Sequence, residues 1–204
     1  MEQLKDKLFG VLAGSIEALD FEKWLYEQQE LMEIIDSNAL VYQVVCLNYK
    51  HQTIVNTIDM ICESIGDEEA YLVSKLERGC RELLKTKEPE VILDIINSIG
   101  DFYDYESEYH LLQEFYQFEE VLISSRSYRS YSENEIVVNN YKGYSKNEIL
   151  LNSTKLAASV LIKLDKLPLN NKRQVLYDEL KEDMGPSLEQ ASKTKWYDFF
   201  KIRR

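Results

Sequence analysis

The sequence predicts an all-α fold, an irregular multi-helix bundle of about eight or nine helices. Three observations support this prediction. Apolar residues recur at helical spacing through most of the chain. The 204 residues include only 7 glycines and 3 prolines, which disfavours turn-rich β architectures. Hydrophobic residues make up 45% and charged residues 29%, a balance typical of a globular protein with a sizeable core.

The first 65 residues are expected to form a helical lobe, and residues 66–204 a helical body, with both parts in one compact unit. Asp20 precedes an aromatic and apolar run, residues 21–26, which indicates a helix. Residues 41–49 are rich in valine and tyrosine, so they suit a buried strand as well as a helix. We interpret them as a helix.

The next three helices have clear boundaries. Apolar residues from Ile54 to Ile65 follow one helical stripe, and Gly66 is expected to end that helix. Asp67 is a suitable N-cap for a second helix that reaches about Lys85. Pro89 fits the first turn of a third helix, which should end near Gly100.

The remaining elements are separated by a long polar stretch. A helix is expected from about Glu106 to Ile123, and residues 124–144 form the longest loop, for which a short hairpin is an alternative. Ser145 and Glu148 form a capping box at the start of another helix. The sequence predicts a further helix between Pro168 and Gly185, and a last one after Ser187.

The cysteines give no sign of a cross-link or a metal site. Cys46, Cys62 and Cys80 are odd in number, lie among apolar residues and include no C-x-x-C pair. We expect three buried thiols, no metal and no cofactor.

The charge of the chain is strongly polarised. The formal net charge is -12 and the isoelectric point is about 4.7, which disfavours direct binding to nucleic acid or anionic lipid. Residues 1–125 hold 26 acidic and 9 basic side chains, whereas residues 126–204 hold 10 acidic and 15 basic ones. A basic protein is therefore the favoured partner.

The N-terminus lacks the apolar run of a signal peptide and no stretch approaches the roughly 18 apolar residues of a membrane span, so we expect a cytoplasmic protein without membrane contact.

The densest acidic stretch supplies the candidate partner-binding site. Residues 88–120 contain ten acidic side chains and neither lysine nor arginine. Within them, residues 101–109 interleave carboxylates with aromatic rings, a composition that suits a protein interface with basic residues opposite. The candidate binding residues are Asp101, Tyr103, Asp104, Tyr105, Glu106, Glu108 and Tyr109. Two alternatives remain open for this segment: a solvated first helical turn, and a hard-cation site, although the spacing of a calcium loop is missing.

No familiar catalytic motif is present. His110 lies four residues after Glu106, which does not fit the Glu-x-x-His pattern of helical di-iron sites, and His51 has no acid or nucleophile at a suitable spacing. The chain contains no Gly-x-Ser-x-Gly elbow, Ser-x-x-Lys pair or Walker loop. We therefore expect a protein that is not an enzyme, with a hidden enzyme or cofactor carrier as the least favoured alternative.

One segment resembles a known class of proteins. Phe21-Glu22-Lys23-Trp24-Leu25-Tyr26, the spacing to Tyr42, and then Leu47-Asn48-Tyr49-Lys50 resemble the opening segment of small bacterial immunity-type proteins. The resemblance covers about residues 15–65 and transfers no functional residue. It implies a non-enzymatic inhibitor that masks a toxin domain, frequently a cationic nuclease.

The combined expectation is an acidic protein that neutralises a basic partner, an immunity protein acting on a cognate nuclease-like toxin. The alternative is a phage or mobile-element protein that mimics nucleic acid and inhibits a host nuclease or DNA-binding protein. Both use the same electrostatics, so the sequence does not separate them.

Overall fold

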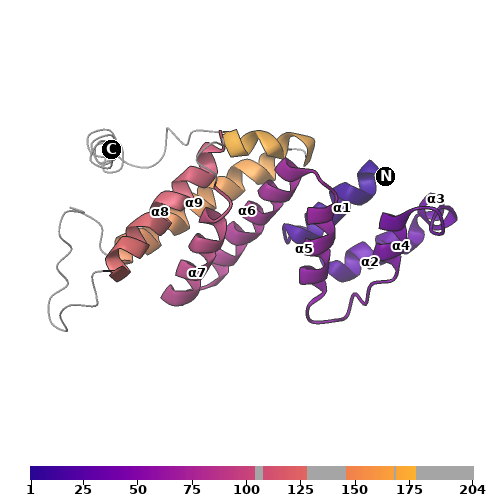
Figure 1. Ribbon diagram of the computed structural model, residues 1–204, viewed down its shortest axis with the longest axis horizontal. Helices are drawn as coiled ribbons and strands as arrows, with labels where there is room; N and C mark the ends of the chain where they lie inside the picture. Colours follow the sequence, from indigo (N-terminus) through magenta and orange to yellow (C-terminus); the bar gives the residue numbers. More distant parts are fainter. Residues whose placement is uncertain (104–107, 128–145, 168, 178–204) are drawn as a thin grey trace.

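The computed structural model is all-α, in agreement with the predicted fold class. It describes residues 1–103, 108–127, 146–167 and 169–177, and these residues contain helices and no strand. The helices are α1 (Glu2–Leu12), α2 (Ala18–Glu27), α3 (Gln29–Glu33), α4 (Ala39–Val45), α5 (Ile54–Ser64), α6 (Glu68–Lys85), α7 (Pro89–Gly100), α8 (His110–Ser127), α9 (Lys146–Lys166) and the 3-10 helix η2 (Leu169–Tyr177). Figure 1 shows α1 to α5 at one end of the molecule and α6 to α9 side by side at the other.

Local chemistry explains the sharp boundaries around α5, α6 and α7. Gly66 ends the α5 segment with a φ of 75°, a backbone conformation that a residue with a Cβ rarely adopts. The Asp67 side chain then accepts a hydrogen bond from the backbone N–H of Ala70 and caps α6. Pro89 occupies the first turn of α7, where no backbone N–H is required. All three predicted boundaries are confirmed.

The first hydrophobic core joins α1 to α5. Leu8, Phe21, Leu25 and Ile58 are completely buried within it. Tyr49 is also buried, and its hydroxyl donates a 2.6 Å hydrogen bond to the backbone carbonyl of Val44 at the end of α4. This bond satisfies the polar atom of an otherwise apolar site. The core extends through the sequence as far as the N-terminal turn of α6.

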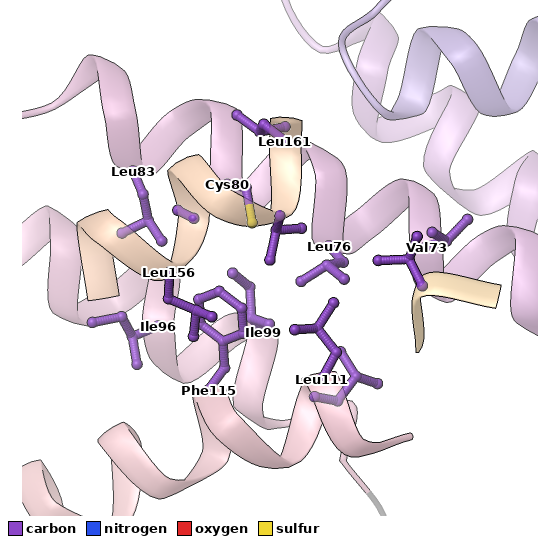
Figure 2. Packing of buried hydrophobic residues seen from close by; sticks show 14 of the residues in the cluster. Val73, Leu76, Cys80, Leu83, Ile96, Ile99, Leu111, Phe115, Leu156 and Leu161 are labelled. Atoms are coloured by element: carbon purple, nitrogen blue, oxygen red, sulfur yellow. The ribbon is translucent and has the colours of Figure 1, made fainter. Parts of the chain in front are cut away.

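The second core lies between α6, α7, α8, α9 and η2. Figure 2 shows its packed centre, where side chains from four helices meet, among them Cys80, Ile96, Phe115 and Leu156. α6 and α7 approach closely because residue 79 is glycine: a Cβ there would lie 2.6 Å from Cδ1 of Ile99. Residues of η2 close one side of this core, with Val175 and Leu176 completely buried.

Polar contacts join α6 to its neighbours on both sides. Lys75 of α6 lies 2.6 Å from a carboxylate oxygen of Asp59 on α5, and the Tyr71 hydroxyl donates a 2.9 Å hydrogen bond to the other oxygen. On another part of α6, the nearly buried Glu77 accepts contacts from Arg81 at 2.6 Å and from Lys172 of η2 at 2.7 Å. α6 therefore connects the two cores.

Several details differ from the sequence-based expectations. Residues 41–49 begin as a helix, as expected, but α4 ends at Val45. The helix expected from Glu106 to Ile123 runs instead from His110 to Ser127, and Asp20 lies inside α2 rather than before it. Leu169–Tyr177 is a 3-10 helix, not the start of a longer α-helix. The proposed hairpin and the last helix fall in residues 128–144 and 178–204, outside the described residues.

The cysteine prediction is correct for two thiols and wrong for the third. Cys62 and Cys80 are buried, whereas Cys46 is exposed. Cys46 is the residue after the last turn of α4. The core-facing side of this short helix is formed by Val41 and Val44, which are buried. The apolar sequence around Cys46 reflects those neighbours rather than its own burial.

Candidate partner-binding surface

The described ends of the predicted binding segment, residues 101–103 and 108–109, lie between α7 and α8, and Phe102 packs beside the N-terminal half of α6. Phe102 makes an edge-to-face contact with Tyr71 of α6, with ring centroids 6.3 Å apart. The ammonium group of Lys75 lies 5.6 Å from the centroid of the Phe102 ring. These contacts attach the start of the segment to α6.

The two described tyrosines of the predicted site pack against the protein itself. Tyr103 is half-buried, with its ring centroid 5.4 Å from that of Tyr116 on α8. Tyr109 is also half-buried and makes an edge-to-face contact with Tyr177 of η2, again at 5.4 Å. Both rings lie against the second core. Their area is therefore largely used within the fold rather than offered to a partner.

The two described carboxylates of the predicted site are exposed. Asp101 follows the last turn of α7, and Glu108 lies two residues before α8. Asp104, Tyr105 and Glu106 lie outside the described residues. In the described part of the segment, the acidic side chains thus face solvent while the aromatic ones face inward.

The fold adds carboxylates from a distant part of the sequence. Burial raises the pKa of Tyr109, and the negative charge of nearby Glu68 and, more weakly, Glu69 raises it further. Burial also raises the pKa of Tyr71, followed by its hydrogen bond to Asp59 and the charges of Asp59 and Glu63. Glu63 and Glu68 are exposed and Glu69 is half-buried. We call Glu63, Glu68, Glu69, Asp101 and Glu108 the acidic surface.

The three glutamates of this surface were not among the predicted binding residues. They lie around the predicted boundary between the helices that end at Gly66 and begin at Asp67, far from residue 101 in the sequence. The signal available was the acidic first turn of the second helix, with Glu68 and Glu69. Phe102 packs on Tyr71 of α6, and Tyr109 packs on Tyr177, whose hydroxyl donates a hydrogen bond to Glu69; these contacts place the turn near the α7–α8 connection.

Some of the basic side chains of the C-terminal half pack against the acidic N-terminal half. Lys172 contacts Glu77, and Arg173 lies 2.6 Å from a carboxylate oxygen of Asp67. The Tyr177 hydroxyl donates a hydrogen bond to Glu69 at the edge of the acidic surface. These ion pairs neutralise part of the positive charge of residues 126–204 within the molecule.

The described residues contain no metal-ligand cluster, and both histidines are exposed. Within them, no three His, Cys, Asp or Glu side chains are placed to hold a metal ion. His51 is exposed, with Nδ1 2.9 Å from the Thr53 hydroxyl, and His110 is exposed at the start of α8. No helix in the described ranges has both the length and the apolar character needed to cross a bilayer. Electrostatic binding is the chemistry that the exposed carboxylates can support.

Comparison with known proteins gives no relative. No protein-family model matches the chain, and neither a curated protein nor a solved structure is detectably similar to it.

Proposed function

We propose that this chain is a non-enzymatic acidic protein that binds and neutralises a basic protein partner, as an immunity protein does with a cognate toxin. The observation that carries the proposal is the acidic surface, where exposed carboxylates from α5, α6 and the α7–α8 connection flank Tyr71 and its neighbour Phe102, or Tyr109. The net charge of -12 extends the same attraction beyond direct contact.

The surrounding contacts favour binding over chemistry at this surface. Lys75, the nearest described cation on α6, is paired with Asp59, so its charge is offset within the fold. Tyr103 and Tyr109 attach the described ends of the segment to Tyr116 and Tyr177. Carboxylates on a folded surface steer a basic partner into contact. A nuclease-like toxin, which needs a basic cleft for phosphate, fits this description.

A charge-reversal experiment tests the proposal. We would replace Glu68, Asp101 and Glu108 by lysine and capture partners from the source cell's lysate at low and moderate salt. The matched control replaces Glu88, Glu90 and Asp94 by lysine. These three are also exposed, lie toward the N-terminal end of α7, away from Asp101, and change the net charge by the same amount. Glu68 and Glu90 both occupy the first turn of a helix, so the two variants lose similar helix-dipole stabilisation.

We expect one basic protein to be retained by the wild type and the control and lost by the test variant, with weaker retention at higher salt. Equal retention by the wild type and both variants would show that the acidic surface is not the binding site. The number of different proteins bound distinguishes an immunity protein from the alternative function, a nucleic-acid mimic. A nucleic-acid mimic would compete with duplex DNA for several unrelated DNA-binding proteins, whereas an immunity protein would bind one cognate partner.

A further inference from the structure

A second surface of the protein presents the exposed aromatic side chains that the acidic surface lacks. Leu19, Lys23 and Tyr26 are spaced by four and three residues on α2, so they lie along one face of that helix. Leu19 is 45% exposed and Tyr26 is 52% exposed, and Tyr42 of neighbouring α4 is 56% exposed. We call Leu19, Lys23, Tyr26 and Tyr42 the α2 face. Large apolar side chains with this exposure are typical of contact sites when they adjoin one another.

The fold holds Tyr26 by a contact with α4. The Tyr26 hydroxyl contacts the backbone carbonyl of Val45 at 3.4 Å, which ties the end of α2 to the end of α4. On the opposite side of α2, Phe21 and Leu25 are completely buried, and the Phe21 ring lies 5.7 Å from that of Trp24. α2 is thus anchored on one side and offers the other side to solvent. Rigid aromatic side chains of this kind are the usual anchors of protein interfaces.

A hollow of about 630 Å³ continues the α2 face at its N-terminal end. Leu19 and Lys23 line it together with apolar residues from α1 and α5, including Val11, Ile54 and Val55. The charged residues of its lining are Glu17, Asp20, Lys23 and Lys50, two of each sign. The hollow and the α2 face share Leu19 and Lys23 and therefore form one continuous feature.

The charge of this region identifies the kind of partner that fits. Residues 1–65, which include α1 to α5, contain 11 acidic side chains and 4 basic ones, so this end of the molecule favours a basic partner. The Lys23 ammonium group lies 3.1 Å from Asp20, so its charge is offset locally. Glu17 and Glu27 are exposed at the two ends of α2, and Glu22 is half-buried between them. Lys50 at the hollow and Lys7, which lies 5.5 Å from the centroid of the Trp24 ring, are the cations that approach this region from neighbouring elements.

We propose that the hollow and the α2 face dock a basic amphipathic segment of a protein partner. An apolar side chain of the partner enters the hollow, further apolar groups cover Tyr26 and Tyr42, and its lysines or arginines face Glu17, Glu22 and Glu27. This inference rests on the proposed function, because it takes a basic protein as the partner. It adds that the aromatic anchors of the contact lie on α2 and α4, with the acidic surface supplying charge alone.

Peptide titration followed by NMR tests the inference on the full chain. The probes are a helical peptide of lysine and leucine and an oligolysine of equal charge, each added to the 15N-labelled protein. We expect the lysine–leucine peptide to shift resonances of α2, α4 and the lining of the hollow. It should bind at least about tenfold more tightly than oligolysine, because only it can fill the hollow.

Matched variants show which side chains contribute to the binding affinity. Tyr26→Ala together with Tyr42→Ala should weaken binding of the lysine–leucine peptide by about tenfold or more. The control, Leu151→Ala with Ile162→Ala on α9, removes side chains of nearly the same exposure, 54% and 56%, and should leave the affinity unchanged. The amide spectra of both double variants check that the fold is retained.

The outcomes separate this inference from the proposed function. If both peptides bind with equal affinity and shift only resonances around Glu68, Asp101 and Glu108, the α2 face is not a docking site and the acidic surface keeps its proposed function. Unchanged affinity in the tyrosine variant would likewise overturn the α2 assignment. If neither peptide shifts any resonance, the α2 assignment fails, and the capture experiment with the charge-reversal variants decides the proposed function separately.

Discussion

The carboxylate of Glu77 lies in the interior between two cations. Its side chain is 2% exposed, with one oxygen 2.6 Å from Arg81 and the other 2.7 Å from Lys172, whose side chain is 11% exposed. Arg81 has a second acceptor in Asp165, but no second acceptor is recorded for Lys172 among the described residues. Removing one partner of a buried pair leaves the other charge without compensation, which costs more than the pair itself contributes.

We therefore predict that Glu77→Ala lowers the free energy of unfolding by about 3–5 kcal/mol, measured by urea denaturation followed by circular dichroism. Adding Lys172→Met should recover much of the loss, because no unpaired buried ammonium group then remains. Asp165→Asn is the control. The Asp165 side chain is 59% exposed, so its contact with Arg81 should contribute less than about 1 kcal/mol. A loss for Glu77→Ala as small as that for Asp165→Asn would contradict the prediction.

Glu114 on α8 provides a second prediction, in which the substitution raises the free energy of unfolding instead of lowering it. Burial raises the pKa of its carboxyl group above the ordinary value of 4.5. The folded state thus holds the proton more tightly than the unfolded state, and the protein loses stability as the pH rises through this carboxyl's titration range. Glu114→Gln should therefore increase the free energy of unfolding at pH 7. The gain should vanish near pH 3.5, where the wild-type group is protonated in both states. Urea denaturation at the two pH values measures the difference, and an equal gain at both would show that ionisation is not the cause.

At the scale of a single element, the start of α6 depends on both oxygens of Asp67. One oxygen accepts the N–H of Ala70 at 3.2 Å, and the other lies 2.6 Å from Arg173 of η2. Asp67→Ala removes both interactions and should cost about 1–2 kcal/mol. Asp67→Asn keeps a good N-cap and loses only the ionic part of a pair whose arginine is 40% exposed, so its cost should stay below about 1 kcal/mol. Thermal and urea denaturation of the two variants give the comparison. Equal losses would mean that the ion pair, not the cap, sets the stability of this helix start.

The elements also differ in how well the sequence predicted them. Boundaries fixed by local chemistry, at Gly66, Asp67 and Pro89, could be predicted because a turn, a cap or a missing N–H acts within a few residues. The 3-10 geometry of η2 could not be predicted from the sequence. Its contacts with Asp67, Glu69 and Glu77 depend on α6, a helix about a hundred residues earlier in the chain.

In the candidate site, too, the sequence predicted some features and not others. Clustered carboxylates at 101–109 were visible in the sequence, and Asp101 and Glu108 are exposed as a solvated charge should be. The inward packing of Tyr103 and Tyr109 was not visible, since composition alone does not distinguish an aromatic ring at an interface from one against a core. The exposed tyrosines, Tyr26 and Tyr42, lie in a region whose pattern predicted helices and resembles immunity-type proteins, but neither basis predicted that these two rings face solvent.

At the scale of the whole molecule, two hydrophobic cores share one helix. The turn of α6 that contains Ala70 belongs to the core of α1 to α5, and the turns from Leu72 to Leu83 belong to the core of α7, α8, α9 and η2. The contact of Lys75 and Tyr71 with Asp59 of α5 reinforces this junction. Unfolding of either core should disturb α6 and thereby the other core.

We therefore predict that the two cores unfold together. The chain has two tryptophans, Trp24 and Trp196. Trp24 packs on the first core, so in a Trp196→Phe variant its fluorescence reports that core alone, while circular dichroism reports all helices. The two signals should give the same urea midpoint, as two-state unfolding requires. Replacing Asp59 by Ala removes the partner of both Lys75 and Tyr71, and should lower the shared midpoint or separate the two signals. If the signals already differ before Asp59 is replaced, α6 does not couple the cores, and each core is an independent folding unit.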